Sequence, residues 1–199
     1  MAGQPLNETA HYADAASKAK EVIDGAGSIG LFNTYGEVHD ESLKNTQEHI
    51  FSLQYWSDVA GNPMTNMFPN FKPVSYRGPS GTGSTIPEIK FYESFEAGDH
   101  RTVDQQGWFY STYYENGDGD SFPLGGQYIF KHFNVTANGT SGVPGTTKDD
   151  LNVLIIRYPE VLLIYAEVSN EVGGPNQLAV DGLKAIRDRA TLATRCRSL

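Results

Sequence analysis

The sequence predicts a mainly helical protein in which long irregular loops carry a small β element. Two apolar helical segments flank a Gly-Gly-Pro turn between residues 157 and 191, and an alanine-rich helical pattern covers residues 9–24. Between them lie short stretches of alternating apolar and polar residues, surrounded by segments rich in Gly and Pro. Helical periodicity towards both ends, with alternation only in the middle, indicates a helical scaffold with an inserted β element.

Length and charge restrict the class of protein. The chain has 199 residues, enough for a single core, and its 21 Gly and 10 Pro predict long loops. Its net charge of −9 opposes binding to nucleic acid or to an anionic membrane, so a neutral ligand fits better. Cys196 is the only cysteine, which excludes an intrachain disulfide. No stretch approaches 18 apolar residues, and residues 1–6 do not form a signal peptide.

Residues 9–24 predict an amphipathic helix with small residues on its apolar side. That side carries Tyr12, Ala15, Ala16, Ala19, Val22 and Ile23. Alanines at this spacing let helices approach closely, which suits a tetratricopeptide-like array of helical hairpins.

The middle of the chain predicts the β element. Residues 48–56, EHIFSLQYW, alternate as a short strand does, and residues 57–85 then predict a long irregular excursion. Residues 107–114, GWFYSTYY, form the densest aromatic patch, and residues 127–133, QYIFKHF, alternate again. We expect these last two segments to pair across a tight turn at 115–120.

A short helix is predicted between these β segments. It covers residues 88–95, and a turn follows in which Asp99 and Arg101 are expected to form a structural ion pair.

Two motifs resemble ion or nucleotide sites but lack essential parts. Residues 78–85, GPSGTGST, look like a phosphate-binding loop, yet the lysine is missing and Pro87 follows where a helix should begin. Asp118 and Asp120 lack the glycine and closing glutamate of a calcium loop, so a turn is the better interpretation. The five histidines show no metal-ligand spacing. We therefore expect no metal and no cofactor.

The helical hairpin is the most strongly patterned part of the chain. An apolar run follows Glu160 and predicts a helix buried on most sides. Gly173 and Gly174 are suited to end that helix, and Asn176 is suited to cap the next one, which continues to residue 190.

This hairpin also resembles that of a known family. The string Arg157-Tyr158-Pro159-Glu160-Val161-Leu162-Leu163-Ile164-Tyr165-Ala166-Glu167, then Asn170-Glu171 and Ile186-Arg187-Asp188-Arg189-Ala190, is similar to the signature hairpin of the SusD/RagB family. Members of that family are surface lipoproteins of Bacteroidetes that capture nutrients, mostly glycans. The resemblance implies a SusD-like fold and non-catalytic binding of an oligosaccharide, or less often a peptide. It further implies delivery to a SusC-like TonB-dependent transporter at the outer membrane, with membrane attachment only through a lipid anchor absent from this chain.

The resemblance predicts that the chain is a fragment covering the later-middle part of a family member, with roughly half of that member missing. We expect one SusD/RagB-like domain over 1–199, in four parts. These are a helical repeat part at 1–47, a loop-rich insertion with short strands at 48–150, the signature hairpin at 151–191, and a tail of uncertain origin at 192–199. Because further helices should cover the hairpin, we expect it to expose apolar surface and to aggregate.

Aromatic side chains are the candidate ligand contacts. Sugars are bound by flat aromatic faces, with amides and charged groups hydrogen-bonding their hydroxyls. The predicted platforms are Trp56, Tyr76, Trp108, Tyr110, Tyr113 and Tyr114. The alternative for each is packing in the core or against a sheet.

Carboxylates of the hairpin are the candidate catalytic groups. Glu160, Glu167 and Glu171 stand at intervals of seven and four, so two or three of them share a helical side. We expect them, with Arg157, to hold helices together, and we expect no enzyme activity. A glycoside hydrolase and a helical-repeat scaffold for protein partners remain the alternative functions.

Overall fold

The computed structural model describes residues 10–64, 85–103, 108–115, 120–134 and 149–190, and of 113–115 and 120–122 only the backbone. Its helices are α1 (Tyr12–Asp24), α2 (Ser57–Ala60), α4 (Ile89–Glu93), α6 (Tyr158–Gly173) and α7 (Gln177–Ala190). Its strands are β1 (His49–Leu53), β2 (Phe109–Glu115), β3 (Asp120–Ile129) and β4 (Val153–Arg157). Short 3₁₀ turns cover Gly36–His39, Glu41–Leu43 and His100–Thr102. The mainly helical fold class with a small β element is confirmed.

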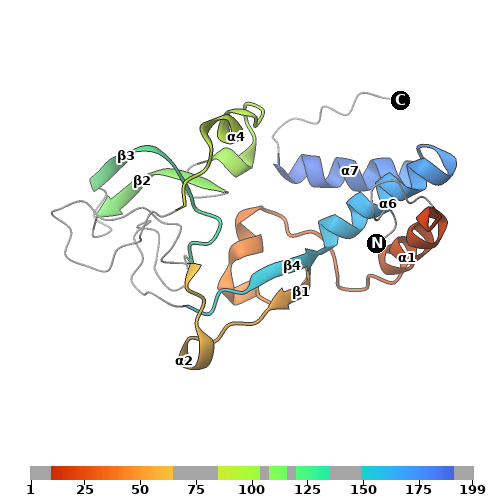
Figure 1. The fold of residues 1–199 in the computed structure, drawn as a ribbon, viewed down its shortest axis with the longest axis horizontal. Helices are drawn as coiled ribbons and strands as arrows, with labels where there is room; N and C mark the ends of the chain where they lie inside the picture. The colour runs from red at the N-terminus through yellow and green to blue at the C-terminus, as the bar shows by residue number, and fades with distance from the viewer. Residues whose placement is uncertain (1–9, 65–84, 104–107, 116–119, 135–148, 191–199) are drawn as a thin grey trace.

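The long helices gather at one end of the molecule, the β2–β3 hairpin lies at the other, and the β1–β4 pair lies between (Figure 1). Helix α1 packs against α6, and α6 against α7. Ala19, Tyr165, Ala166 and Ala179 form the buried centre of this packing. A Cβ added at Gly182 would lie 3.4 Å from Cδ2 of Leu162, so α6 and α7 approach closely there. The predicted helices at 9–24 and in the hairpin are confirmed.

The hairpin turn forms as the sequence predicts. Gly174 adopts φ +82°, which glycine accepts at low cost, and the Oδ1 atom of Asn176 accepts a hydrogen bond from the backbone N of Ala179 at 3.0 Å. Helix α6 begins at Tyr158. Pro159 lies in its first turn, where a backbone N–H has no partner within the helix and its absence is tolerated.

Strands β1 and β4 pair antiparallel although they are about 100 residues apart in the chain. Leu53 lies opposite Val153, and His49 lies opposite Arg157. The predicted strand at 48–56 is too long: β1 ends at Leu53, and the backbone N of Ala60 donates to the carbonyl of Trp56 at 2.7 Å. Helix α2 therefore stands where the sequence predicted irregular chain.

The predicted β hairpin is confirmed, with a shift in its second strand. Phe109 lies opposite Ile129, and β3 covers 120–129 instead of 127–133. The strand ends early because the chain turns: the N of Phe133 donates to the carbonyl of Phe130, and the N of Phe130 to the carbonyl of Trp108, both at 2.7 Å.

Helix α4 covers the first residues of β2. The rings of Phe91, Tyr92 and Phe95 lie edge-on to Phe109, at 6.1, 5.0 and 5.6 Å between centroids. The predicted Asp99–Arg101 pair is present after this helix, with Nε of Arg101 donating to Oδ1 of Asp99 at 2.9 Å. Burial acts to raise the pKa of Asp99, but its hydrogen bonds from Arg101 outweigh burial and lower the pKa.

A fully buried carboxylate joins the helical hairpin to the sheet. Oε1 of Glu48 accepts a hydrogen bond from Nη1 of Arg157 at 2.5 Å, while Oε2 accepts from Nη1 of Arg189 and from the backbone N of Phe32. The Arg189 side chain is itself only 6% exposed. Two arginines of the signature hairpin thus converge on a glutamate that lies more than 100 residues before them.

The hairpin glutamates do not share this role. Glu160, Glu167 and Glu171 are exposed, and within the described part of the chain the structure gives them no ion pair. The prediction that they hold helices together is therefore wrong for these three residues, and Arg157 pairs with Glu48 next to β1 and not with a residue of another helix. Their exposed position on α6 leaves them solvated.

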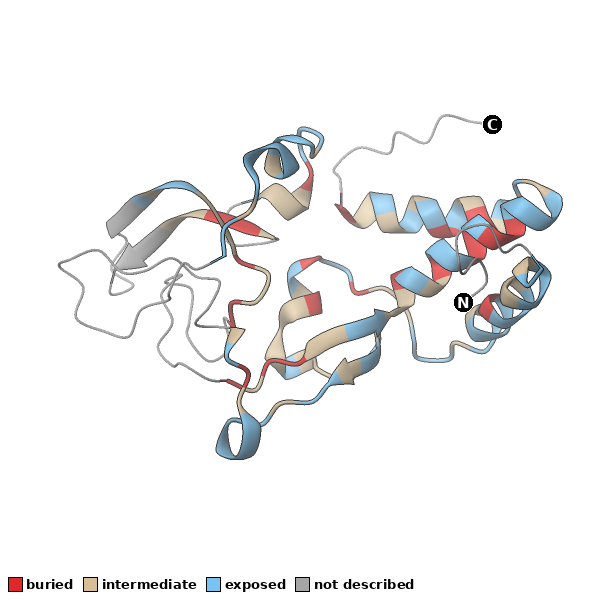
Figure 2. Ribbon diagram, in the orientation of Figure 1, coloured by how far each residue is buried: buried red, intermediate tan, exposed pale blue. Residues whose placement is uncertain are grey.

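Apolar side chains remain exposed on the hairpin. Leu163, Ile164 and Val172 are 46%, 41% and 55% exposed on α6, and the pale blue residues of α6 and α7 in Figure 2 mark these outer faces. This agrees with the expected apolar surface, and aggregation stays a prediction. Among the described helices none is both long and apolar enough to cross a membrane. Three predicted features lie outside the described residues. They are residues 78–84 of the phosphate-loop motif, Asp118, and the tail with Cys196.

Three histidines whose pKa values are lowered by burial make the stability of the fold sensitive to acid. Burial lowers the pKa of His39 well below 6.5 and also lowers that of His49, while burial and the Lys131 charge lower the pKa of His132 to about 4. The unfolded chain takes up these protons near pH 6.5, whereas the folded chain does not. Acidification below pH 6.5 therefore favours unfolding.

We expect the free energy of unfolding to fall between pH 7 and pH 5, with His132 alone contributing about 2 kcal/mol. Asp99 and Asp150, whose pKa values are lowered by hydrogen bonds, lose their contribution only below about pH 4, so this window reports the histidines. Urea unfolding at both pH values measures the change. The variant His132→Gln should reduce the difference, and His11→Gln, at an exposed position, is its control. Equal unfolding free energies at pH 7 and pH 5 would contradict this account.

Candidate functional site

Trp56 is the most exposed described aromatic side chain among the predicted ligand contacts. Its residue is 62% exposed, and its Nε1 donates to Oδ2 of Asp58 at 3.3 Å. The residue lies between β1 and α2, and Figure 2 shows the neighbouring turn of α2 exposed as well. An indole fixed through its N–H by a neighbouring carboxylate keeps its faces available for stacking.

A cluster of neutral polar side chains forms around Gln54, two residues before Trp56. We call Asn45, Ser52, Gln54 and Asn152 the amide cluster. Oε1 of Gln54 accepts from Nδ2 of Asn45 at 2.8 Å and from Nδ2 of Asn152 at 3.0 Å. Nε2 of Gln54 donates to Oδ1 of Asn45 and to Oγ of Ser52, both at 2.8 Å. The cluster is a preformed set of donors and acceptors, and Asn45 and Gln54 within it are exposed.

Trp56 lies close to the amide cluster along the chain. Trp56 has extended backbone angles, φ −145° and ψ 114°, and it follows Gln54 by two residues. Cα atoms two residues apart lie no more than about 7 Å apart. The stacking surface and the hydrogen-bonding amide of Gln54 are therefore neighbours along the chain.

Residues 150–152, which lie more than 85 positions later in the sequence, hold this surface in place. The backbone N of Tyr55 donates to Oδ1 of Asn152 at 3.0 Å, and the N of Ser57 donates to Oδ1 of Asp150. Asn62, which is fully buried, donates through Nδ2 to the carbonyl of Leu151 at 2.7 Å. The segment around Trp56 is thus fixed along the residues that lead into β4.

The charged groups beside Trp56 are mainly acidic. Asp58 accepts a hydrogen bond from the indole, and the hydrogen bond from the Ser57 backbone lowers the pKa of Asp150. Lys44 is the described cation that reaches this segment, donating to the carbonyl of Asp150 at 3.2 Å. The local charge is negative.

Trp108 is held as part of the scaffold. Its Nε1 donates to the hydroxyl of Tyr35, Nζ of Lys131 lies 4.4 Å from the centre of its ring, and the Phe91 ring centre lies at 5.8 Å. The Tyr35 hydroxyl is itself buried, and burial raises its pKa to about 12. A cation over one face and a tilted ring beside it leave Trp108 poorly placed for stacking on a sugar.

Tyr110 belongs to the core. It is 1% exposed and packs with Tyr128 and Phe130, at 6.3 and 5.4 Å between ring centroids. Its prediction as a ligand platform is not kept, because its ring faces are covered by protein. Tyr76 and the side chains of Tyr113 and Tyr114 lie outside the described residues, so their predicted role stays a prediction.

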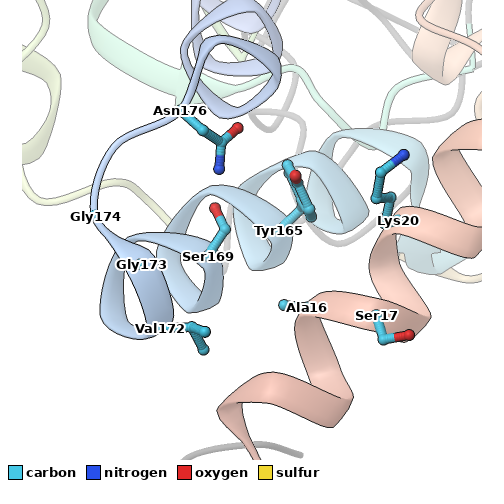
Figure 3. Close-up of a pocket in the computed structure, with 9 residues that line it drawn as sticks. All are labelled: Ala16, Ser17, Lys20, Tyr165, Ser169, Val172, Gly173, Gly174 and Asn176. Atoms are coloured by element: carbon cyan, nitrogen blue, oxygen red, sulfur yellow. The ribbon is translucent and has the colours of Figure 1, made fainter.

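A hollow of about 370 Å³ lies at the other end of the molecule, between α1, α6 and the turn after α6 (Figure 3). Ala16, Tyr165 and Val172 are among its apolar lining residues. Its polar groups serve the scaffold: Lys20 pairs with Asp24 at 2.6 Å, and Asn176 caps α7. We therefore take the surface around Trp56 as the candidate site.

The amide cluster was not foreseen from the sequence. Ser52 and Gln54 alternate with apolar residues in the predicted strand, which is the only local signal, and Asn152 lies about 100 residues away. Only the β1–β4 pairing brings these residues together.

Comparison with known proteins identifies the family. The SusD family model matches residues 103–195. A crystal structure of a SusD superfamily protein from Parabacteroides distasonis is 32% identical, with a TM-score of 0.80 over 97% of this chain and 41% of that chain. The chain belongs to the SusD/RagB family. It spans about two fifths of the length of that solved structure.

More distant solved structures share the fold. Surface glycan-binding protein A from Bacteroides thetaiotaomicron, solved in complex with laminarihexaose, is 20% identical, with a TM-score of 0.70 over 96% of this chain and 45% of that chain. Surface glycan-binding protein A from Bacteroides uniformis is also 20% identical, with a TM-score of 0.69 over 98% of this chain and 41% of that chain. Comparison with curated protein sequences gives no match.

Proposed function

We propose that this chain takes part in binding an oligosaccharide, without cleaving it, at the surface formed by Trp56 and the amide cluster. The observation that supports this most directly is the exposed indole two residues from an exposed, hydrogen-bonded set of amides. The apolar face of a sugar ring stacks on the indole, and its hydroxyls exchange hydrogen bonds with Asn45 and Gln54. Membership of the SusD/RagB family supports oligosaccharide binding as the function.

Binding by this surface requires little rearrangement. The amides already hold one another, and the backbone of residues 55–62 is fixed to residues 149–152. A preformed surface loses less conformational entropy when a ligand binds. Oligosaccharide hydroxyls replace water molecules that bind Asn45 and Gln54, so these hydrogen bonds contribute little net free energy. Most of the binding free energy therefore comes from stacking on the indole and from excluded water.

We further propose that the family member containing this chain acts at the bacterial outer membrane and delivers its ligand to a SusC-like TonB-dependent transporter. Purification of the tagged protein from outer membranes, followed by identification of the co-purifying chains, tests this step. We expect a TonB-dependent transporter in stoichiometric amount. Its absence, with the tagged protein intact in the membrane fraction, would contradict the delivery step while leaving glycan binding open.

Isothermal titration of the protein with a panel of neutral oligosaccharides, including laminarihexaose and a xylogluco-oligosaccharide, tests the binding function. Each mixture is then analysed by chromatography for cleavage products. We expect saturable binding of at least one oligosaccharide and unchanged ligand. Cleavage products would favour a glycoside hydrolase, and the absence of binding to every oligosaccharide would favour a scaffold for protein partners.

A further inference from the structure

The charge around Trp56 bears on which sugars the site accepts. Every described side chain in the amide cluster is neutral, so the cluster can serve hydroxyls but cannot neutralise a carboxylate. Asp58 accepts a hydrogen bond from the indole N–H, and Asp150 accepts one from the backbone N of Ser57, the residue after Trp56. A sugar carboxylate stacked on Trp56 would therefore meet the like charge of Asp58, with Asp150 one residue further along the chain.

The described arginines are engaged elsewhere. Arg157 and Arg189 pair with Glu48, and Arg101 pairs with Asp99. Proteins that recognise carboxylates commonly use the planar fork of arginine, because it donates two parallel hydrogen bonds. Lys44 donates to the carbonyl of Asp150, and its charge offsets part of the charge of that carboxylate. Among the described residues the site thus has two carboxylates, one lysine and no arginine.

We infer that the site selects neutral oligosaccharides and disfavours those that carry carboxylates, such as uronic acid and sialic acid glycans. This inference rests on the proposed function and adds the chemical class of the ligand. The discrimination comes from Asp58 and Asp150 together with the neutral amides, while the net charge of −9 acts in the same direction at longer range.

The test compares each neutral oligosaccharide with its own acidic form. Laminarihexaose and a xylogluco-oligosaccharide are titrated before and after oxidation of their C6 hydroxymethyl groups to carboxylates. At low ionic strength we expect the oxidised forms to bind at least about tenfold more weakly, and we expect added salt to reduce this difference because it screens the repulsion. The salt dependence separates charge from the loss of the C6 hydroxyl.

Asp58→Asn isolates the local charge, since asparagine can still accept a hydrogen bond from the indole N–H. We expect it to raise the affinity for the oxidised form, relative to the neutral form, about threefold at low salt. Glu171→Gln removes the same charge from an exposed position on α6 and should leave this ratio unchanged. Together these variants distinguish an effect at the site from an effect of total charge.

Two results would overturn the inference alone, and a third would overturn the proposed function as well. Oxidised sugars that bind as tightly as the neutral ones, or an affinity ratio that Asp58→Asn leaves unchanged, would overturn the charge selection while oligosaccharide binding stands. No binding of either form would overturn the proposed function and the inference with it.

Discussion

Replacing Glu48 with glutamine is expected to lower the free energy of unfolding by about 3–5 kcal/mol. Glutamine keeps the size of the side chain but removes the charge that faces Arg157 and Arg189. Since the Arg189 side chain is only 6% exposed, its guanidinium would remain in the interior without an ionised partner. Urea unfolding followed by far-ultraviolet circular dichroism at pH 7 measures the loss.

Two further variants show whether the cause is the unpaired charge. Glu171→Gln makes the same chemical change at an exposed position, and we expect it to alter the free energy by no more than about 0.5 kcal/mol. The triple variant Glu48→Leu, Arg157→Met, Arg189→Met removes all three charges, and we expect it to recover much of the lost stability. A Glu48→Gln protein as stable as the unchanged chain would show that the ion pairs of Glu48 with Arg157 and Arg189 do not hold the hairpin to the sheet.

Replacing Trp56 with alanine is expected to weaken oligosaccharide binding about 30-fold, which corresponds to about 2 kcal/mol. The indole supplies the stacking surface, whereas the amide cluster supplies hydrogen bonds that compete with water. Because Trp56 is 62% exposed, we expect little change in the free energy of unfolding. Isothermal titration with the best ligand of the neutral panel measures the affinity.

The controls for Trp56→Ala use one exposed and one packed side chain. Val59, which is 88% exposed on α2, can be changed to alanine with little expected effect on binding or stability. Trp108→Ala should instead reduce stability, because it removes the hydrogen bond to Tyr35 and the contacts with Phe91 and Lys131. If Trp108→Ala abolishes binding in a folded protein while Trp56→Ala does not, the site lies at β2 and not beside α2.

Local sequence signals predicted the helical part of the fold well. The end of α6 at Gly174 and the cap of α7 at Asn176 depend on residues within one turn of the chain, so the sequence contains the needed information. The partner of β1 was not predicted, since strand pairing across about 100 residues leaves no local pattern. The role of Glu48 was missed for the same reason.

The candidate site was predictable only in part. Alternation in a strand places Trp108 and Tyr110 on one face, but it does not say whether that face meets solvent or the core. Tyr110 is buried because Phe130 folds back over it, and Trp108 is covered by Lys131, which the chain turn after β3 brings close. Trp56 remains exposed because the chain leaves β1 at Leu53 and turns into α2.

Tryptophan fluorescence reports directly on whether an oligosaccharide binds at Trp56, since the chain contains only Trp56 and Trp108. In a Trp108→Phe protein, Trp56 is the sole fluorescent indole, and we predict that the best neutral oligosaccharide shifts its emission to shorter wavelength with the affinity found by titration. The Trp56→Phe protein, which retains Trp108, should show no such shift. Binding by calorimetry with no change in Trp56 emission would contradict the assignment of this surface as the oligosaccharide site.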